Sequence, residues 1–310
     1  MKANYVSLAP FLLWKDLPRP TPWGRIFGRD APLCLEIGFG NGEFLVQYAL
    51  EHEDQNILGV EQFWPSMRRC LKRLSSSGAC NVRVLQVDVR VALEWLFEPG
   101  SLHRIISLFP CPWPKKKHAH HRLFGGDFLR LLCNRMRDQA ELLVVSDWIE
   151  YRDWILNQVP DCLAVRSRPV APLFGTKYER KWVGEGRRTF HEISFRREKE
   201  TSWTMRAEVA LENRRMGRFD AQSLRPFEDS REGIAVVAKE WLFDPVQQRA
   251  LVRVLVSEEP LVQSFWVEIA RESSPDGWVV RPAQGCGMVP TAGVQRALDL
   301  CQEMFSARLA

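Results

Sequence analysis

Residues 33–43, LCLEIGFGNGE, lead from an apolar run of strand length into a loop with three alternating glycines, Gly38, Gly40 and Gly42. A helical pattern follows at about residues 42–50. Glycines there let the backbone turn tightly and approach a ligand with no Cβ in the way. A dinucleotide site would show G-x-G-x-x-G and no carboxylate beside the phosphates. Because Glu36 precedes these glycines, the loop is better suited to a cationic ligand.

The same alternation of strand and helix continues along the chain. Strand-length apolar runs occupy residues 33–37, 56–60, 82–87, 104–109 and 142–146, and helical patterns lie between or after them at about 65–77, 89–97, 126–137 and 149–157. Strands separated by helices predict right-handed βαβ units and a parallel sheet. Residues 189–197 alternate like an antiparallel edge strand. The pattern therefore predicts a Rossmann-like α/β domain with a mostly parallel sheet over residues 31–198.

The flanking segments differ in character from this domain. Residues 1–30 are rich in Pro and Trp without a lasting period, which predicts an arm lying over the domain. A polar stretch at residues 196–202 predicts a linker. Beyond it, apolar runs at 234–243, 250–256, 262–270 and 278–281 precede an amphipathic pattern at 291–308. We expect residues 203–310 to form a smaller C-terminal α+β domain.

Composition bounds the class of protein. The chain has 310 residues, 45% hydrophobic and 26% charged, enough for two domains with cores of their own. There is no apolar stretch of membrane-spanning length and no signal-peptide pattern, so we expect a cytoplasmic protein. The eight cysteines form no C-x-x-C pair, which predicts reduced thiols and no zinc site.

Charge is distributed unevenly along the chain. Residues 1–200 hold 30 Lys and Arg against 23 Asp and Glu, whereas residues 201–310 hold 13 against 15. The densest basic run is KKKHAHHR, residues 115–122. This balance makes the first part of the chain the candidate partner of a polyanion. For the second part it favours a packing or assembly role, with polyanion docking as the alternative.

Acidic residues end three successive predicted strands. Glu36 is at the end of the first strand, Glu61 ends the second where a ribose diol would lie, and Asp88 follows the third near an adenine amino group. Glu61 or Asp88 could instead be a helix N-cap. Taken together, the three acids predict a pocket for a cationic nucleoside without phosphate. S-adenosylmethionine fits that description, so the sequence predicts a methyltransferase.

More specific segments follow the later strands. They are SLFPCPWPK at 107–115, SDW at 146–148 and GTKYER at 175–180. With the opening LEIGFGNGE, they resemble the bacterial tRNA (guanine-N7-)-methyltransferases over about residues 23–197. The resemblance implies a class I methyltransferase fold, S-adenosylmethionine as cofactor and tRNA as partner. The implied acceptor is N7 of the variable-loop guanine at position 46.

The resemblance also implies roles for individual residues. Glu36, Glu61 and Asp88 match family residues that hold the cofactor, and the glycine loop is assigned to the same cofactor set. The residues that match those assigned to tRNA are Lys115, Asp147, Thr176 and Glu179. Cys111 stands where the family has an active-site aspartate, so it is assigned to the cofactor set and, with Asp147, to the catalytic pair.

The cysteine leaves several interpretations open. Guanine N7 carries a lone pair and no proton, so methyl transfer needs positioning more than a base. A thiol cannot replace the hydrogen bonds of a carboxylate. The chain is therefore an enzyme, or else a tRNA-binding paralogue with weak or no transfer. Cys111 as a nucleophile toward a pyrimidine, a neutral substitution there, and an amine methyltransferase are the remaining alternatives.

Overall fold

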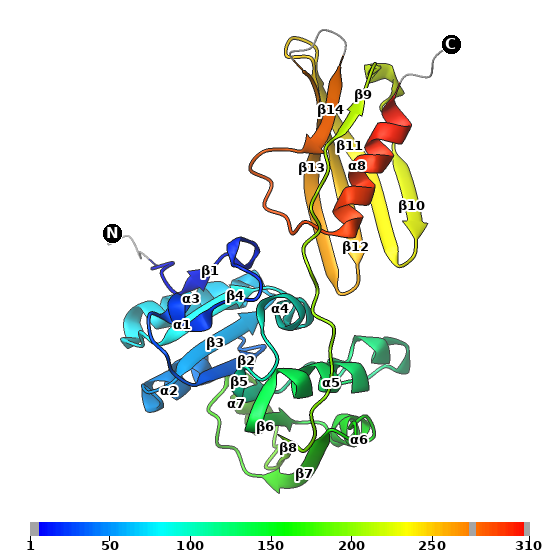
Figure 1. The fold of residues 1–310 in the computed structure, drawn as a ribbon. Coiled ribbons are helices and arrows are strands. Elements are labelled where there is room, and N and C mark those ends of the chain that lie inside the picture. Colours follow the sequence, from blue (N-terminus) through cyan, green and yellow to red (C-terminus); the bar gives the residue numbers. More distant parts are fainter. Residues whose placement is uncertain (1–5, 273–276, 307–310) are drawn as a thin grey trace. The chain divides into compact units, whose positions relative to one another are not determined.

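The computed structural model describes residues 6–272 and 277–306 and divides the chain into two compact units, residues 1–205 and 206–310. Each unit has its own sheet (Figure 1). Within the described ranges, no helix is long and apolar enough to cross a membrane.

The first unit is built on a mixed sheet. Among the described residues it has eight strands, in the order β1-β4-β3-β2-β5-β6-β8-β7. The strands from β1 to β6 pair in parallel, and β8 is antiparallel to both β6 and β7. This order is that of the predicted Rossmann-like methyltransferase class. The strands are β1 (Phe11–Leu12), β2 (Leu33–Ile37), β3 (Asn56–Glu61), β4 (Val82–Gln86), β5 (Leu102–Leu108), β6 (Met136–Ser146), β7 (Leu163–Val170) and β8 (Phe190–Arg197).

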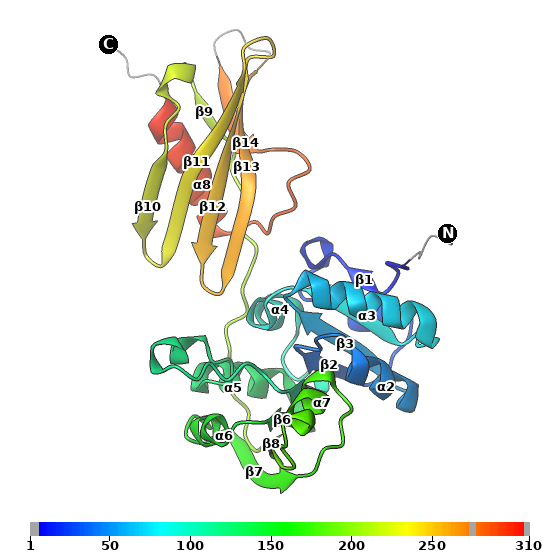
Figure 2. The same ribbon diagram turned by 180° about the vertical axis from the view of Figure 1, so that it is seen from behind.

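Helices cover both faces of this sheet (Figures 1 and 2). One core lies between the sheet and helices α2 and α3, and α7 packs on the same face through Trp182 and Val183. Helices α4, α5 and α6 cover the other face. The helices are α1 (Trp23–Phe27), α2 (Glu43–Glu51), α3 (Trp64–Ser77), α4 (Val89–Leu96), α5 (Gly126–Arg135), α6 (Ile149–Leu156) and α7 (Lys177–Gly184), with short 3-10 turns η1 (Trp14–Asp16) and η2 (Lys116–His121).

Two details of the sheet differ from expectation. β8, predicted as an edge strand, lies inside the sheet, and the edge is β7, which the sequence did not predict. Arg166, Ser167 and Arg168 in β7 are exposed, so the strand lacks an apolar alternation and depends on its pairing with β8. In the N-terminal arm, Phe11 and Leu12 pair with β4 and extend the sheet.

The strand order also fixes where a ligand would bind. Parallel strands β2 to β6 end at one rim, and the chain runs outward in opposite directions from β2 and β5. A crevice opens at such a switch point because the following loops diverge. Backbone bonds from Gly38 to Val60 (2.8 Å) and from Phe109 to Val145 (2.8 Å) hold the loop starts together.

As far as the structure describes it, the second unit is an antiparallel sheet with one helix on it. In the described part of the chain its strand order is β10-β11-β12-β13-β14-β9, and α8 crosses one face (Figure 1). Val252, Val254 and Val256 of β12 pack under α8 with other buried apolar side chains. The elements are β9 (Arg214–Met216), η3 (Ala221–Ser223), β10 (Phe227–Arg231), β11 (Ile234–Asp244), β12 (Arg249–Glu258), β13 (Leu261–Arg271), β14 (Trp278–Pro282) and α8 (Ala292–Phe305).

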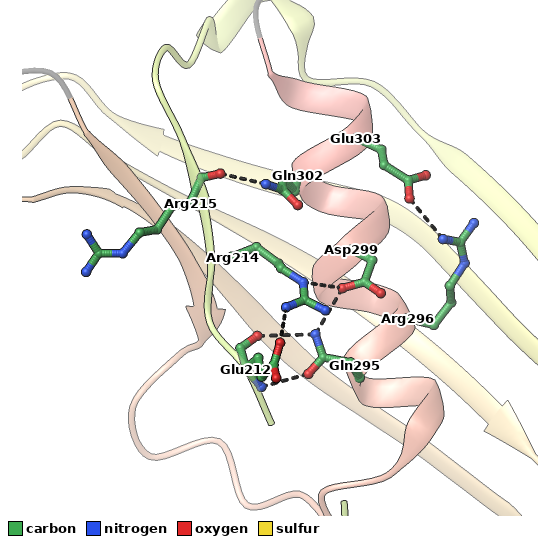
Figure 3. Close-up of polar contacts among 8 residues, drawn as sticks. All are labelled: Glu212, Arg214, Arg215, Gln295, Arg296, Asp299, Gln302 and Glu303. Atoms are coloured by element: carbon green, nitrogen blue, oxygen red, sulfur yellow. Dashed lines mark hydrogen bonds and ion pairs between the residues drawn. The ribbon is translucent and has the colours of Figure 1, made fainter. Parts of the chain in front are cut away.

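A polar network fastens the first strand of this unit to its last helix (Figure 3). Nε of Arg214 donates to Asp299 at 2.7 Å, and the Asp299 oxygen also accepts from Gln295 at 2.9 Å. One helical turn on, Gln302 donates to the carbonyl of Arg215 at 2.6 Å. The Arg214 and Asp299 side chains are half-buried. β9 is short, so these contacts supplement its few ladder bonds to β14.

Candidate functional site

A cavity of about 1250 Å³ opens along the rim where the parallel strands end. It is larger than a typical small-ligand pocket and has room for a nucleoside beside a second group. Six of the predicted site residues line it: Gly38, Gly40, Glu61, Asp88, Cys111 and Asp147. They come from the ends of β2, β3, β4, β5 and β6. The tertiary structure therefore gathers these predicted residues around one space.

Glu36 lies at the inner end of this site. Its side chain lines a smaller adjoining pocket together with Gly38, Gly40 and Thr176. The residue is 5% exposed, and its Oε2 has no hydrogen-bond partner among the described residues. Burial raises the pKa of the carboxyl to about 8, and the charge of Glu61 adds to the effect. A buried acceptor without a partner is costly, so the position fits a cationic ligand group that would pair with it.

The glycine loop has the conformation that the sequence predicts. Gly38 and Gly40 have φ of +70° and +56°, and a Cβ on either would meet open space. Their left-handed backbone is the reason for glycine at both positions. Gly42 also has a positive φ, +73°, and a Cβ there would lie 2.4 Å from Sγ of Cys70. The third glycine therefore lets the loop pack closely on α3.

Glu61 and Asp88 face the cavity, and their carboxylates also accept hydrogen bonds from backbone N–H groups. The N–H of Gly40 donates to Oε2 of Glu61 at 3.0 Å, and Oε1 accepts from Gln62 and Phe63 at 2.8 and 2.9 Å. Asp88 is the N-cap of α4, where its Oδ1 accepts from the N–H of Arg90 at 2.8 Å. It also forms an ion pair with the Arg90 guanidinium at 2.7 Å. The N-cap interpretation thus holds for Asp88 together with cavity lining.

Cys111 belongs to a loop with an unusual backbone. Phe109 and Trp113 have φ of +57° and +44°, the left-handed region that such residues rarely adopt. Non-glycine residues in this region store strain and often occur at functional sites. The thiol of Cys111 is exposed at the cavity, while Trp113 is 37% exposed and contacts the ring of His121 at 4.9 Å.

Arg187 fixes the orientation of Asp147. The guanidinium forms an ion pair with Oδ2 at 3.2 Å and donates to the backbone carbonyl of the same residue. Arg187 also stacks on Trp182, 4.6 Å from the ring centroid. Burial raises the pKa of Asp147, partly offset by this arginine. Asp147 is thus a fixed acceptor that lines the cavity.

Three predicted tRNA-binding residues do not line the large cavity. Glu179 is buried, and its carboxylate accepts from the N–H groups of Leu173 (2.7 Å), Phe174 (3.0 Å) and Gly175 (2.5 Å). Thr176 caps α7 and accepts from the N–H of Glu179 at 3.1 Å. Lys115 is exposed and is not part of the cavity lining. In this structure, Thr176 and Glu179 shape the loop before α7.

Two further residues escaped the sequence reasoning. Tyr178, 49% exposed, lines both the large cavity and the pocket of Glu36. Glu43 at the start of α2 accepts from the N–H of Lys177 and from Arg180 at 2.5 Å. It thereby ties α7 to the glycine loop. The only signal for Tyr178 in the sequence is its place in the segment GTKYER. No sequence pattern indicates the partners of Glu43.

Known proteins match the first unit. A family model described as "Putative methyltransferase" covers residues 30–191, more than half of the chain. A tRNA (guanine-N(7)-)-methyltransferase of Chlorobium phaeobacteroides is 39% identical over 173 residues, which are 55% of this chain and 85% of that protein. The enzyme of the same name from Thermus thermophilus is 39% identical over 170 residues, 54% of each chain.

Other similarities are less complete. The Thermotoga maritima protein of that name is 35% identical over 185 residues, so the chain spans little more than half of the length of this relative and of the Thermus one. The solved structure of the 16S rRNA methyltransferase KamB aligns over 57% of this chain and 93% of its own, with a TM-score of 0.46 and 13% identity. The matching family model and the Chlorobium relative together show that the chain belongs to the tRNA (guanine-N(7)-)-methyltransferase family.

Proposed function

We propose that the protein transfers the methyl group of S-adenosylmethionine to N7 of a guanine in tRNA, the variable-loop guanine at position 46, in the cytoplasm. The main support is the cavity with its adjoining pocket, where the acids of three successive strand ends lie and where His120 and His121 of the basic run also line the wall. The names of the relatives support the same reaction. They favour the enzyme over the binding-only paralogue.

The residues of the rim fit the cofactor, which supplies an electrophilic methyl group on a sulfonium when it is bound. Glu36 would pair its Oε2, which has no partner in the described part of the chain, with the ammonium group. Oε2 of Glu61 accepts one hydrogen bond and would accept a second from a ribose hydroxyl. Asp88 would lie next to the adenine. Gly38 and Gly40 let the backbone come close to the ligand.

Asp147 and Cys111 would lie on the guanine side of the cavity. N7 needs no base, so their task is to orient the purine and offset its developing positive charge. Asp147, fixed by Arg187, can accept a hydrogen bond from the guanine edge. Cys111 offers only a weak donor and acceptor. The exposed lysines Lys115, Lys116 and Lys117 would meet tRNA phosphates.

The proposal is tested by incubating the purified protein with tRNA and labelled S-adenosylmethionine and digesting the product to nucleosides. We expect 7-methylguanosine, reduced at least tenfold in Asp147→Ala. Binding of both ligands without any label in tRNA would identify the binding-only paralogue instead. A methyl group on an exocyclic nitrogen or on a pyrimidine would select one of the other methyltransferase reactions.

Cys111 allows a sharper test of the chemistry. Replacing Cys111 by Asp restores a charged hydrogen-bond acceptor, worth about 1.5–3 kcal/mol. We expect kcat to rise about ten- to a hundredfold. A serine at the same position serves as the matched neutral control and should leave kcat close to that of the natural chain. An unchanged or lower kcat in Cys111→Asp would mean that this site has adapted to the thiol.

A further inference from the structure

Arg122 closes the basic run, yet it does not share the surroundings of the lysines. The lysines at 115–117 are exposed, whereas Arg122 is half-buried after η2. Its Nε donates to the carbonyl of Pro112 at 2.9 Å and its Nη2 to that of Trp113 at 3.3 Å. Both carbonyls belong to the loop that carries Cys111. The forked guanidinium therefore fastens the Cys111 loop through two of its carbonyls.

The same guanidinium lies against α6. It is 5.6 Å from the ring centroid of Trp148, 5.8 Å from that of Tyr151 and 5.1 Å from that of Trp154. These distances are within the range of cation–π attraction, and Tyr151 is fully buried. α6 begins just after Asp147, and Trp148 lines the cavity. Arg122 thus contacts the elements that carry both residues of the predicted catalytic pair.

Resting on the proposed function, we propose that Arg122 is a positioning residue that holds the Cys111 loop against the start of α6 and does not contact tRNA phosphate. Trp113, whose carbonyl it binds, has a left-handed backbone that needs support from its surroundings. Arg122 also lines the large cavity, but two of its donors bind carbonyls of the Cys111 loop and are therefore not directed at a phosphate. Lysine would keep the charge and lose both the fork and the planar stacking.

The experiment compares Arg122→Lys and Arg122→Met with Lys117→Met as the matched control. For both Arg122 variants we expect kcat to fall at least tenfold, while the salt dependence of tRNA binding keeps its slope. For Lys117→Met we expect that slope to decrease by about one, as for a single phosphate contact. A slope lower by about one in Arg122→Met, with kcat unchanged in both Arg122 variants, would overturn the proposal.

Trypsin provides a readout that needs no methylation. Without ligands, we expect cleavage at Lys115, Lys116 and Lys117 to be at least threefold faster in Arg122→Lys and Arg122→Met than in the natural chain, because the loop is released. Lys117→Met tests only the two remaining lysines, which should be cleaved at the natural rate. Cleavage at the natural rate in Arg122→Met would refute the positioning role. If the natural chain methylates no tRNA, the proposed function fails while the cleavage rates still decide the role of Arg122.

Discussion

The buried carboxyl of Glu36 makes cofactor affinity depend on pH. With a pKa of about 8, this group is mostly neutral in the ligand-free protein at pH 7. A cationic ligand group needs the charged form, so binding has to release the proton. Each pH unit below 8 then costs about 1.4 kcal/mol, a tenfold loss of affinity. Between pH 7.0 and 5.5 the Kd of S-adenosylmethionine should rise by about thirtyfold.

Calorimetry measures both parts of this prediction. An α-amino group has a pKa of about 7.7–8.0, so the ligand keeps its charge between pH 5.5 and 7.0. Titrations in buffers with different ionisation enthalpies should therefore report the release of about one proton. In Glu36→Gln the release and the pH dependence should both vanish. Glu51→Gln, an exposed change on α2, is the control and should retain both. A Kd independent of pH in the natural chain would refute the reasoning.

The same carboxyl affects stability without ligand. Its pKa is raised in the folded state, so its contribution is complete below about pH 4.5 and is lost as the pH rises through about 8. From pH 5 to 9 the natural chain should therefore lose several kcal/mol of unfolding free energy from this group. Glu36→Gln should lack this loss, and its Tm should exceed that of the natural chain at pH 9.

Three further changes test the scaffold. Glu43→Gln weakens the tie to Lys177 and α7, so the KM for S-adenosylmethionine should rise about tenfold in steady-state kinetics; an unchanged KM would show that α7 stays in place without it. Gly42→Ala brings a Cβ against Cys70 in a left-handed backbone and should lower the free energy of unfolding in urea by about 2–4 kcal/mol. The control Gly78→Ala, where a Cβ would meet open space, should lower it by about 1 kcal/mol, and equal losses would contradict the clash. Asp299→Ala removes the acceptor of Arg214 and should lower the protection of α8 in hydrogen exchange by about 1–2 kcal/mol with kcat unchanged; full protection would count against the network in Figure 3.

Much of the fold was accessible from local pattern. β2, the glycine loop and α2 follow from residues 33–51 because apolar period and backbone freedom are properties of neighbouring residues. The opposite case is β7, which has no apolar alternation to predict a strand because Arg166 and Arg168 are exposed. It forms because β8 offers a partner from a distant part of the chain.

The site divides in the same way. The sequence by itself determined which acids end successive strands, because a parallel sheet brings Glu61 and Asp88 to one rim whatever their side-chain partners are. Only the tertiary structure decided what each side chain does there. Among the described residues it left an oxygen of Glu36 without a hydrogen-bond partner, directed the Glu179 carboxylate to its own loop and bonded the Arg122 guanidinium to the Cys111 loop. Burial and hydrogen-bond partners depend on residues far apart in the chain, and no local pattern contains them.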